Sequence, residues 1–365
     1  ASNPKTSYLT WETIATWNIG LDMSFLNSRL NFTGDYFIRD TEGMLAKSYV
    51  LPSVFGAKEP KENCADLRTK GWELSFALMG KRFNYTVSAS LGDNKTVITK
   101  YNNPEKLLTD YYEGMVLGEI WGYRVDGLFT SDEEATEYTS KINQDFVNAR
   151  ILSDKVDPYY RAGDLKFRDL DNNNVINKGD DTVYDPGDRE IIGNETPRYN
   201  YSFRLGADWN GFDLGIFFQG VGKRDWYPNH LSTGFWGPYS RAFTSFIPEN
   251  FMDQCWSEEN PGGYFPRFRG YQTFKDSQLG VNNDRYLQNA SYIRLKNLTV
   301  GYTLPVLKKV FTKLRVYFTG ENLWYWSPMK KYTKYIDPEA AGGNGNTGMA
   351  YNYSRNFSVG VDITF

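Results

Sequence analysis

The last nine residues of the chain alternate strictly between apolar side chains and small or polar ones. Residues 357–365 read F-S-V-G-V-D-I-T-F, and the chain ends on an aromatic residue. Because successive side chains of a strand point to opposite faces, this pattern predicts a β-strand with one apolar face. Such an edge would promote aggregation of a soluble protein, whereas closure of a membrane barrel pairs it with another strand. The ending therefore favours an outer-membrane barrel over the alternative, the edge strand of a soluble sandwich.

The same ending resembles the C-terminal assembly signal of bacterial outer-membrane barrels. Gly360, Ile363 and Phe365 hold the expected places, while Val359 stands where a polar residue is commoner. The resemblance implies that these three residues serve as the assembly signal and that the protein lies in the bacterial outer membrane.

The composition is compatible with such a barrel and excludes transmembrane helices. Aromatic residues make up 17% of the chain, which suits interfacial girdles and sugar-stacking surfaces. The mean hydropathy is −0.57, and no apolar run reaches the roughly 18 residues that a transmembrane helix needs. Barrel strands remain possible, because their alternation averages out as polar.

Charge and histidine content exclude other classes of function. The 41 basic and 44 acidic residues nearly balance, so the sequence makes no case for nucleic acid as a partner. His230 is the only histidine, which argues against His-based catalysis and His-rich metal sites. We therefore expect no enzyme. The spacing of Cys64 and Cys255 fits no metal site and leaves open whether the two pair.

Period-two alternation recurs along the whole chain. With the terminal strand, the segments that show it make about nine predicted strands: residues 11–25, 30–38, 72–78, 85–91, 199–209, 212–222, 292–304 and 314–326. Several approach the roughly 9 to 11 residues that cross a bilayer at a tilt. The connections alternate between short and long, the long ones being residues 41–66, 93–197, 223–285 and 328–350. Short turns at one rim and long extracellular loops at the other are typical of outer-membrane barrels.

Several stretches match one family, in family order over essentially the whole chain. They are W-E-T-I-A-T-W-N-I-G-L-D (residues 11–22), R-T-K-G-W-E-L-S (68–75), I-I-G-N-E-T-P-R-Y (191–199), G-F-D-L-G-I-F-F-Q-G-V-G-K-R-D (211–225), N-A-S-Y-I-R-L-K-N-L-T-V-G-Y-T-L-P (289–305) and G-E-N-L-W (320–324). The chain thereby resembles the SusC/RagA family of TonB-dependent outer-membrane transporters.

That resemblance implies a fold, a function and partners. The fold would be an all-β, antiparallel, 22-stranded transmembrane barrel with an N-terminal plug. Residues 1–365 would form its C-terminal portion, with the plug, the remaining strands and the part that engages TonB lying outside this chain. The function would be import of oligosaccharides with a SusD-like surface lipoprotein as lid. The alternatives are a peptide importer of the RagA type and a secreted all-β glycan-binding protein.

One loop carries the spacing of a calcium-binding loop. Residues 169–180 read D-L-D-N-N-N-V-I-N-K-G-D, and Ca²⁺ takes oxygen ligands at positions 1, 3, 5, 7, 9 and 12 of a twelve-residue loop. The predicted ligands are Asp169, Asp171, Asn173, the Val175 carbonyl, Asn177 and Asp180. Asn174 replaces the usual glycine at position 6, and asparagine tolerates the left-handed backbone required there. The alternative is a solvated turn rich in Asn and Asp.

Aromatic residues concentrate in the long loops. We predict that they contribute to cargo binding, because aromatic faces stack on sugar rings; for any one ring, packing within the loops or against the lid is an alternative role. The candidates are Trp121, Tyr123, Trp226, Tyr227, Trp236, Tyr239 and Trp256, with Tyr264 and Tyr271 in the same loops.

Overall fold

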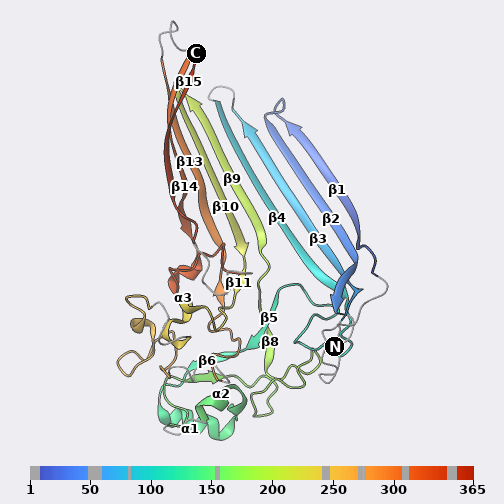
Figure 1. Ribbon diagram of the computed structural model, residues 1–365, viewed down its shortest axis with the longest axis vertical. Coiled ribbons are helices and arrows are strands. Elements are labelled where there is room, and N and C mark those ends of the chain that lie inside the picture. Colours follow the sequence, from blue (N-terminus) through green and yellow to red (C-terminus); the bar gives the residue numbers. More distant parts are fainter. Residues whose placement is uncertain are drawn as a thin grey trace.

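Nine long strands form one antiparallel sheet in the computed structural model (Figure 1). The structure describes residues 9–47, 60–80, 84–152, 157–240, 247–269, 274, 277–305, 312–342 and 352–365. In spatial order the strands are β1 (Thr13–Phe25), β2 (Leu30–Lys47), β3 (Lys61–Met79), β4 (Asn84–Lys100), β9 (Arg198–Trp209), β10 (Phe212–Lys223), β13 (Tyr292–Leu304), β14 (Lys313–Trp326) and β15 (Asn356–Thr364). The spatial order of the long strands is therefore the same as their order along the chain, which is an up-and-down topology.

The sheet is open within the described part of the chain. β1 pairs only with β2, and β15 pairs only with β14. β1 therefore has one free hydrogen-bonding edge, and the described residues form a wall rather than a closed barrel.

The predicted strands are confirmed in place, but β2, β3 and β4 are much longer than predicted. β2, β3 and β4 run for 18, 19 and 17 residues. The predicted connection of residues 41–66 was therefore too long, because strand pairing continues to Lys47 and resumes at Lys61. Register shifts near Thr41 and Met44 interrupt the alternation there, so the period-two signal ends before the strands do.

The short connections lie at one end of the sheet, and their backbone explains their brevity. Asn210 and Gly211 both have positive φ, +48° and +86°, which suits a two-residue hairpin. Leu26, Asn27 and Ser28 also have positive φ in the turn from β1 to β2. The long loops gather at the opposite end (Figure 1).

One face of the sheet is apolar and uncovered. Cross-strand pairing places one row of apolar side chains in register: Met23, Phe32, Phe76, Ala89, Phe203 and Phe218. Phe203 is 38% exposed and Val359 is 76% exposed. No second sheet pairs with or covers the nine strands among the described residues, so the sandwich alternative is wrong. No helix in the described ranges is long and apolar enough to cross a membrane.

The other face carries polar and charged groups that bond across strands. Ser90 and Ser202 share a hydrogen bond of 2.7 Å between their hydroxyls. Near the short turns, Arg315 of β14 donates to both carboxylate oxygens of Asp213 on β10, at 2.8 and 2.6 Å, and to Asp362 on β15. The Arg315–Asp213 pair crosses β13 at Gly301, where a Cβ would lie 2.4 Å from Asp213. Only glycine leaves room for this bridge.

The long loops fold together around a hydrophobic core of their own. We call residues 101–197, 224–291 and 327–342, as far as the structure describes them, the loop assembly. Its elements are β5 (Glu119–Tyr123), β6 (Val125–Leu128), α1 (Asp132–Lys141), α2 (Asp145–Leu152), β7 (Leu165–Phe167), β8 (Arg189–Asn194), β11 (Asp225–Trp226), α3 (Thr233–Trp236), β12 (Gln288–Asn289) and the 3-10 helices η2 (Gly237–Tyr239), η3 (Met252–Gln254) and η5 (Pro328–Lys331). Its buried cluster includes Phe167, Trp236, Phe265, Tyr286 and Met329, which come from all three loops.

A buried ion pair anchors the third loop to the wall. Arg294 of β13 is 1% exposed and pairs with Asp337, and its Nε lies 3.1 Å from Glu339. Lys296 donates to both Glu339 oxygens at 2.8 Å. Breaking a buried pair leaves an uncompensated charge, so this network holds residues 337–339 against β13.

The apolar face predicts a specific response to charge. Phe203→Arg should destabilise the protein by roughly 2 to 4 kcal/mol, because a guanidinium in the hydrocarbon layer loses its hydration. Urea unfolding of the full-length polypeptide in phospholipid vesicles would measure the change.

Gly206→Arg on the same strand is the matched control. Position 206 lies on the polar face, and a Cβ there meets no atom within 4 Å. We expect a change below about 1 kcal/mol for it. Equal destabilisation by the two variants would contradict the assignment of faces.

Candidate functional site

Most of the predicted aromatic cargo residues lie in the core of the loop assembly. Trp236 and Tyr239 are fully buried, and Trp226 and Tyr123 are each 2% exposed. The Trp236 indole N–H donates to the carbonyls of Pro228 and Asn229, at 3.1 and 3.0 Å. These rings stabilise the loops by packing, so direct cargo contact by them would require rearrangement of that core.

Three other aromatic candidates differ in their surroundings. Trp256 is 8% exposed, and the Arg267 guanidinium lies 5.3 Å from its ring centroid. Trp121 and Tyr227 are half-buried and border a hollow of about 440 Å³ that opens to solvent. The structure therefore leaves Trp121 and Tyr227 as the predicted rings that line an open surface. Tyr271 lies outside the described residues.

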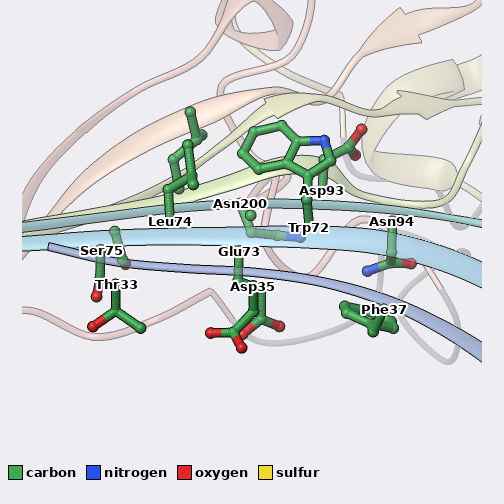
Figure 2. Close-up of a pocket in the computed structure, with 13 residues that line it drawn as sticks. Thr33, Asp35, Phe37, Trp72, Glu73, Leu74, Ser75, Asp93, Asn94 and Asn200 are labelled. Atoms are coloured by element: carbon green, nitrogen blue, oxygen red, sulfur yellow. The ribbon is translucent and has the colours of Figure 1, made fainter. Parts of the chain in front are cut away.

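A second hollow, of about 380 Å³, lies on the wall between β2, β3 and β4. Its polar-face lining carries hydroxyl and carboxylate groups: Thr33, Asp35, Glu73, Ser75 and Ser90. Figure 2 shows Thr33, Asp35, Glu73 and Ser75 on one side of the strands and Trp72 and Leu74 on the other. This division follows the period-two pattern and gives a hydrogen-bonding surface suited to a hydrated lumen.

The loop of residues 169–188 contains a compact cluster of carboxylates, and the residues in this cluster differ from the predicted calcium ligands. Ligand-type oxygens of Asp169, Asp171 and Asp188 all lie within 4.8 Å of one another. Asn173 donates to Asp171 at 2.8 Å, and Asn174 has the left-handed φ of +65° that the loop spacing predicts. The predicted ligand Asp180 does not join the cluster and is exposed.

Asp188 takes the place predicted for Asp180. It is fully buried and accepts hydrogen bonds from the backbone N–H groups of Leu170 and Asn177, at 2.8 and 2.9 Å. Two other predicted ligands bond within the turn, since Asn177 donates to the Val175 carbonyl at 3.1 Å. The sequence signal for Asp188 was an acidic residue after the twelve-residue window, which the fixed spacing missed.

The electrostatics of the cluster fit a bound cation. Burial, together with the charges of Asp171 and Asp169, raises the pKa of Asp188. Asp169 Oδ1 is buried and has no hydrogen-bond donor among the described residues. A buried carboxylate oxygen without a donor is costly, and a hard cation would satisfy it.

The helix α1 begins with a capping box that also binds the next segment. Ser131 Oγ accepts from the Glu134 N–H at 3.1 Å, and Glu134 accepts from the Thr130 N–H and hydroxyl at 2.7 and 2.6 Å. Lys166 donates to the other Glu134 oxygen at 2.8 Å. The Lys166 and Thr130 hydrogen bonds lower the pKa of Glu134 to about 2.

The predicted assembly-signal residues lie in and just beyond β15. Gly360 pairs with Tyr317, whose ring occupies the space where a Cβ would stand, and Ile363 pairs with Leu314. Phe365 is 82% exposed at the end of the strand. Both cysteines are free thiols, Cys255 buried and Cys64 half-buried.

Comparison with known proteins finds relatives over nearly the whole chain. TonB-dependent receptor P3 of Formosa agariphila is 28% identical over 98% of this chain and 34% of its own length. TonB-dependent receptor SusC of Bacteroides thetaiotaomicron is 23% identical over 98% of this chain and 32% of its own length. The chain thus spans about a third of the length of the curated relatives it matches. No family model matches the sequence.

Solved structures show the same fold. The RagAB peptide transporter superposes with a TM-score of 0.68 at 22% identity, over 98% of this chain and 36% of that chain. The RagAB peptide importer in its open-open state superposes with a TM-score of 0.65 at 23% identity, over 98% of this chain and 35% of that chain.

An antiparallel wall with one apolar and one polar face, short turns at one end and folded loops at the other, is part of a transmembrane β-barrel of the TonB-dependent type. The relatives above are TonB-dependent receptors that include SusC, and their similarity over nearly the whole chain supports a place in the SusC/RagA family of TonB-dependent transporters.

The capping box predicts a pH-dependent stability of α1. The pKa of Glu134 in the folded protein lies below the ordinary value of 4.5. The stabilisation of α1 by the ionised Glu134 carboxylate is therefore complete above pH 4.5 and is lost as the pH falls through about 2. Glu134→Gln should destabilise α1 by about 1 kcal/mol at pH 7 and by less at pH 3. Hydrogen exchange of the backbone amides of residues 132–141 at the two pH values measures the stability of α1 in the parent and the variant.

Glu133→Gln is the control in the same turn, because Glu133 is exposed and makes no contact that the structure shows. It should leave hydrogen exchange unchanged. A pH-independent effect of Glu134→Gln would contradict the charged role of the carboxylate.

Proposed function

We propose that this chain is the C-terminal part of the barrel of an outer-membrane, TonB-dependent importer that takes up oligosaccharides with a SusD-like lipoprotein. The apolar face of the sheet carries the membrane part of this proposal, because hydrocarbon is the environment in which such a surface is stable. The rest of the barrel and the plug would come from a part of the polypeptide outside this chain, and pair with the free edges of β1 and β15.

The loop assembly supports the proposal of a lipoprotein partner. Its three loops share one core, so they present a surface with a defined shape rather than separate flexible segments. A defined surface can bind a folded partner without a large ordering cost. TonB would act through the part of the polypeptide outside this chain.

Peptide import is the second candidate. The similarity to RagAB, named a peptide transporter, is the observation that favours it. Oligosaccharide is favoured here because Trp121 and Tyr227 border an open hollow, where rings can stack on sugar faces.

We also propose that Asp169, Asp171 and Asp188 bind a structural Ca²⁺, with Asn173 beside them. Three carboxylates in a space of this size need a compensating charge, and oxygen ligands suit a hard cation. The ion would order residues 169–188 and have no part in chemistry.

The loop core predicts a separation between insertion and partner binding. Trp236→Ala removes a fully buried ring from the loop assembly and should destabilise its core by about 3 to 5 kcal/mol. We expect the full-length protein to insert in the outer membrane but to lose its copurifying lipoprotein and its TonB-dependent uptake of labelled oligosaccharide.

Tyr184→Ala is the control, because Tyr184 lies in the same assembly but is 74% exposed. The Tyr184→Ala variant should keep both its copurifying lipoprotein and its TonB-dependent uptake of labelled oligosaccharide. An oligosaccharide uptake that persists without TonB, or that Trp236→Ala leaves at the parental rate, would count against the proposal.

The calcium proposal predicts a difference between two aspartates. After treatment with a chelator, added Ca²⁺ should slow proteolysis within residues 165–190 of the full-length protein. Asp169→Asn should weaken Ca²⁺ binding at least about tenfold by calorimetric titration, because affinity follows ligand charge. Asp180→Asn should leave it unchanged. Weakening by both substitutions would restore the twelve-residue ligand set, which contains both residues, and the absence of any calcium effect would rule out the site.

A further inference from the structure

Two lysines stand directly opposite each other on the apolar face of the wall. Lys70 of β3 pairs with Lys95 of β4 in a regular stretch of the ladder. They lie two positions along their strands from Trp72 and Asp93, which Figure 2 shows on the same side of the strands as Leu74. Because side chains alternate along a strand, both lysines belong to the face that carries Leu74.

No residue in the same cross-strand row neutralises this pair. The row continues through Ile38 of β2 to Trp17 of β1, so it holds no acidic residue in these four strands. Both lysines are exposed, and neither forms an ion pair with a carboxylate of the described residues. Opposite side chains have Cβ atoms only about 5 Å apart, and like charges at that spacing destabilise the sheet. An anion bound between the two ammonium groups would relieve their repulsion.

The acidic residues of the two adjacent rows already have cationic partners. On the side of the long loops, Asp40 accepts from Arg68 Nε and Nη2, at 2.7 and 3.0 Å. On the other side, Asp93 forms an ion pair with Arg198. Glu42 lies a row beyond Asp40, further from the lysines. The two lysines therefore keep their excess positive charge in the part of the wall that the structure describes.

The lysine pair lies where the apolar surface ends. The next row towards the short turns carries Tyr36 and Trp72, and the row after it carries Leu21 and Leu74. The rings of Trp17 and Tyr36 contact each other edge to face, with their centroids 6.2 Å apart. Aromatic girdles of this kind border the hydrocarbon in outer-membrane barrels, and the lipid head groups lie beyond them.

The length of β3 supports this position in the membrane. From Met79, at the short-turn end of the strand, Lys70 lies roughly 30 Å along the strand, or about 23 Å across the membrane at a tilt near 40°. The apolar band of such barrels is about 25 Å tall. The two ammonium groups therefore reach the head groups at the end that carries the long loops, which is the outer leaflet in an outer-membrane barrel.

From these observations we infer that Lys70 and Lys95 form a binding site for a phosphorylated lipid of the outer leaflet. Its phosphate accepts hydrogen bonds from both ammonium groups, and its acyl chains lie along the apolar rows of Leu21 and Leu74. A lipid suits the site better than a soluble anion, because the charged pair borders the apolar rows directly. The inference rests on the outer-membrane placement in the proposed function and adds a lipid partner to it.

Native mass spectrometry of the purified full-length protein in detergent tests the site, because it resolves each bound lipid and its affinity. The probes are bisphosphorylated lipid A, its dephosphorylated form, phosphatidylglycerol and inorganic phosphate. We expect lipid A to bind more tightly than the other three. Lys70→Gln combined with Lys95→Gln should weaken lipid A binding at least about tenfold, because each lysine near a charged lipid surface contributes to affinity.

Two control variants separate a specific site from a general effect of charge. Lys70→Arg combined with Lys95→Arg keeps both charges and should retain lipid A binding. Lys313→Gln removes a charge from the polar face, beside Arg315 near the short turns, and should bind lipid A as the parent does. The comparison of lipid A with its dephosphorylated form uses the parent protein alone, so it decides the role of the phosphate even where a variant fails to fold.

Several results would overturn the inference. Absence of lipid A binding, or equal binding of the dephosphorylated form, would show that the lysines recognise no lipid phosphate. Equal binding of phosphatidylglycerol would leave only a general attraction to anionic lipids, and binding of inorganic phosphate alone would indicate a soluble anion. Lipid A binding that the double glutamine substitution leaves unchanged would place the lipid elsewhere. TonB-dependent uptake, measured separately, would be retained in each of these cases if the proposed import function is correct.

Discussion

The apolar face of the nine-stranded sheet is the constraint on which the rest of the structure depends. In water that face would have to be covered, and the described residues place neither a second sheet nor a layer of helices over it. Hydrocarbon removes the need for cover, provided that every backbone group is paired with a neighbouring strand. Ladders that run from β1 to β15 meet that condition along most of the sheet, and they are interrupted at register shifts such as the one between Phe217 and Phe218 and at the two edges.

This arrangement separates the molecule into two regions with opposite patterns of burial. In the wall, large apolar side chains face outward and polar groups meet one another on the other face, as Ser90 and Ser202 do. The loop assembly has the burial pattern of a water-soluble protein, with large apolar side chains inside: Trp236 and Phe265 are fully buried. Loops of this length lie beyond the membrane, so water drives their apolar side chains into a core of their own.

The two regions are joined by charge as well as by chain connections. The Arg294, Asp337 and Glu339 network holds the third loop on β13. Such pairs specify position, because a displaced partner would leave a buried charge unpaired. The loop assembly is thus held at the end of the sheet opposite the short turns.

The sequence alone determined the strands, their order and the alternation of short and long connections. These depend on period two and on turn residues such as Asn210 and Gly211, which are local properties of the chain. The ends of β2 and β3 were missed, because bulges and polar residues remove the alternation while backbone pairing continues.

Only the tertiary structure decided which loop residues act together. Asp188 rather than Asp180 completes the carboxylate cluster, since the chain folds back over a longer distance than a fixed loop spacing allows. Asn282 reaches Trp121 across 161 positions in the sequence, and most of the aromatic residues predicted to meet cargo form the core instead. Composition can place aromatic rings in a loop, but packing against distant segments determines which of them remain at the surface.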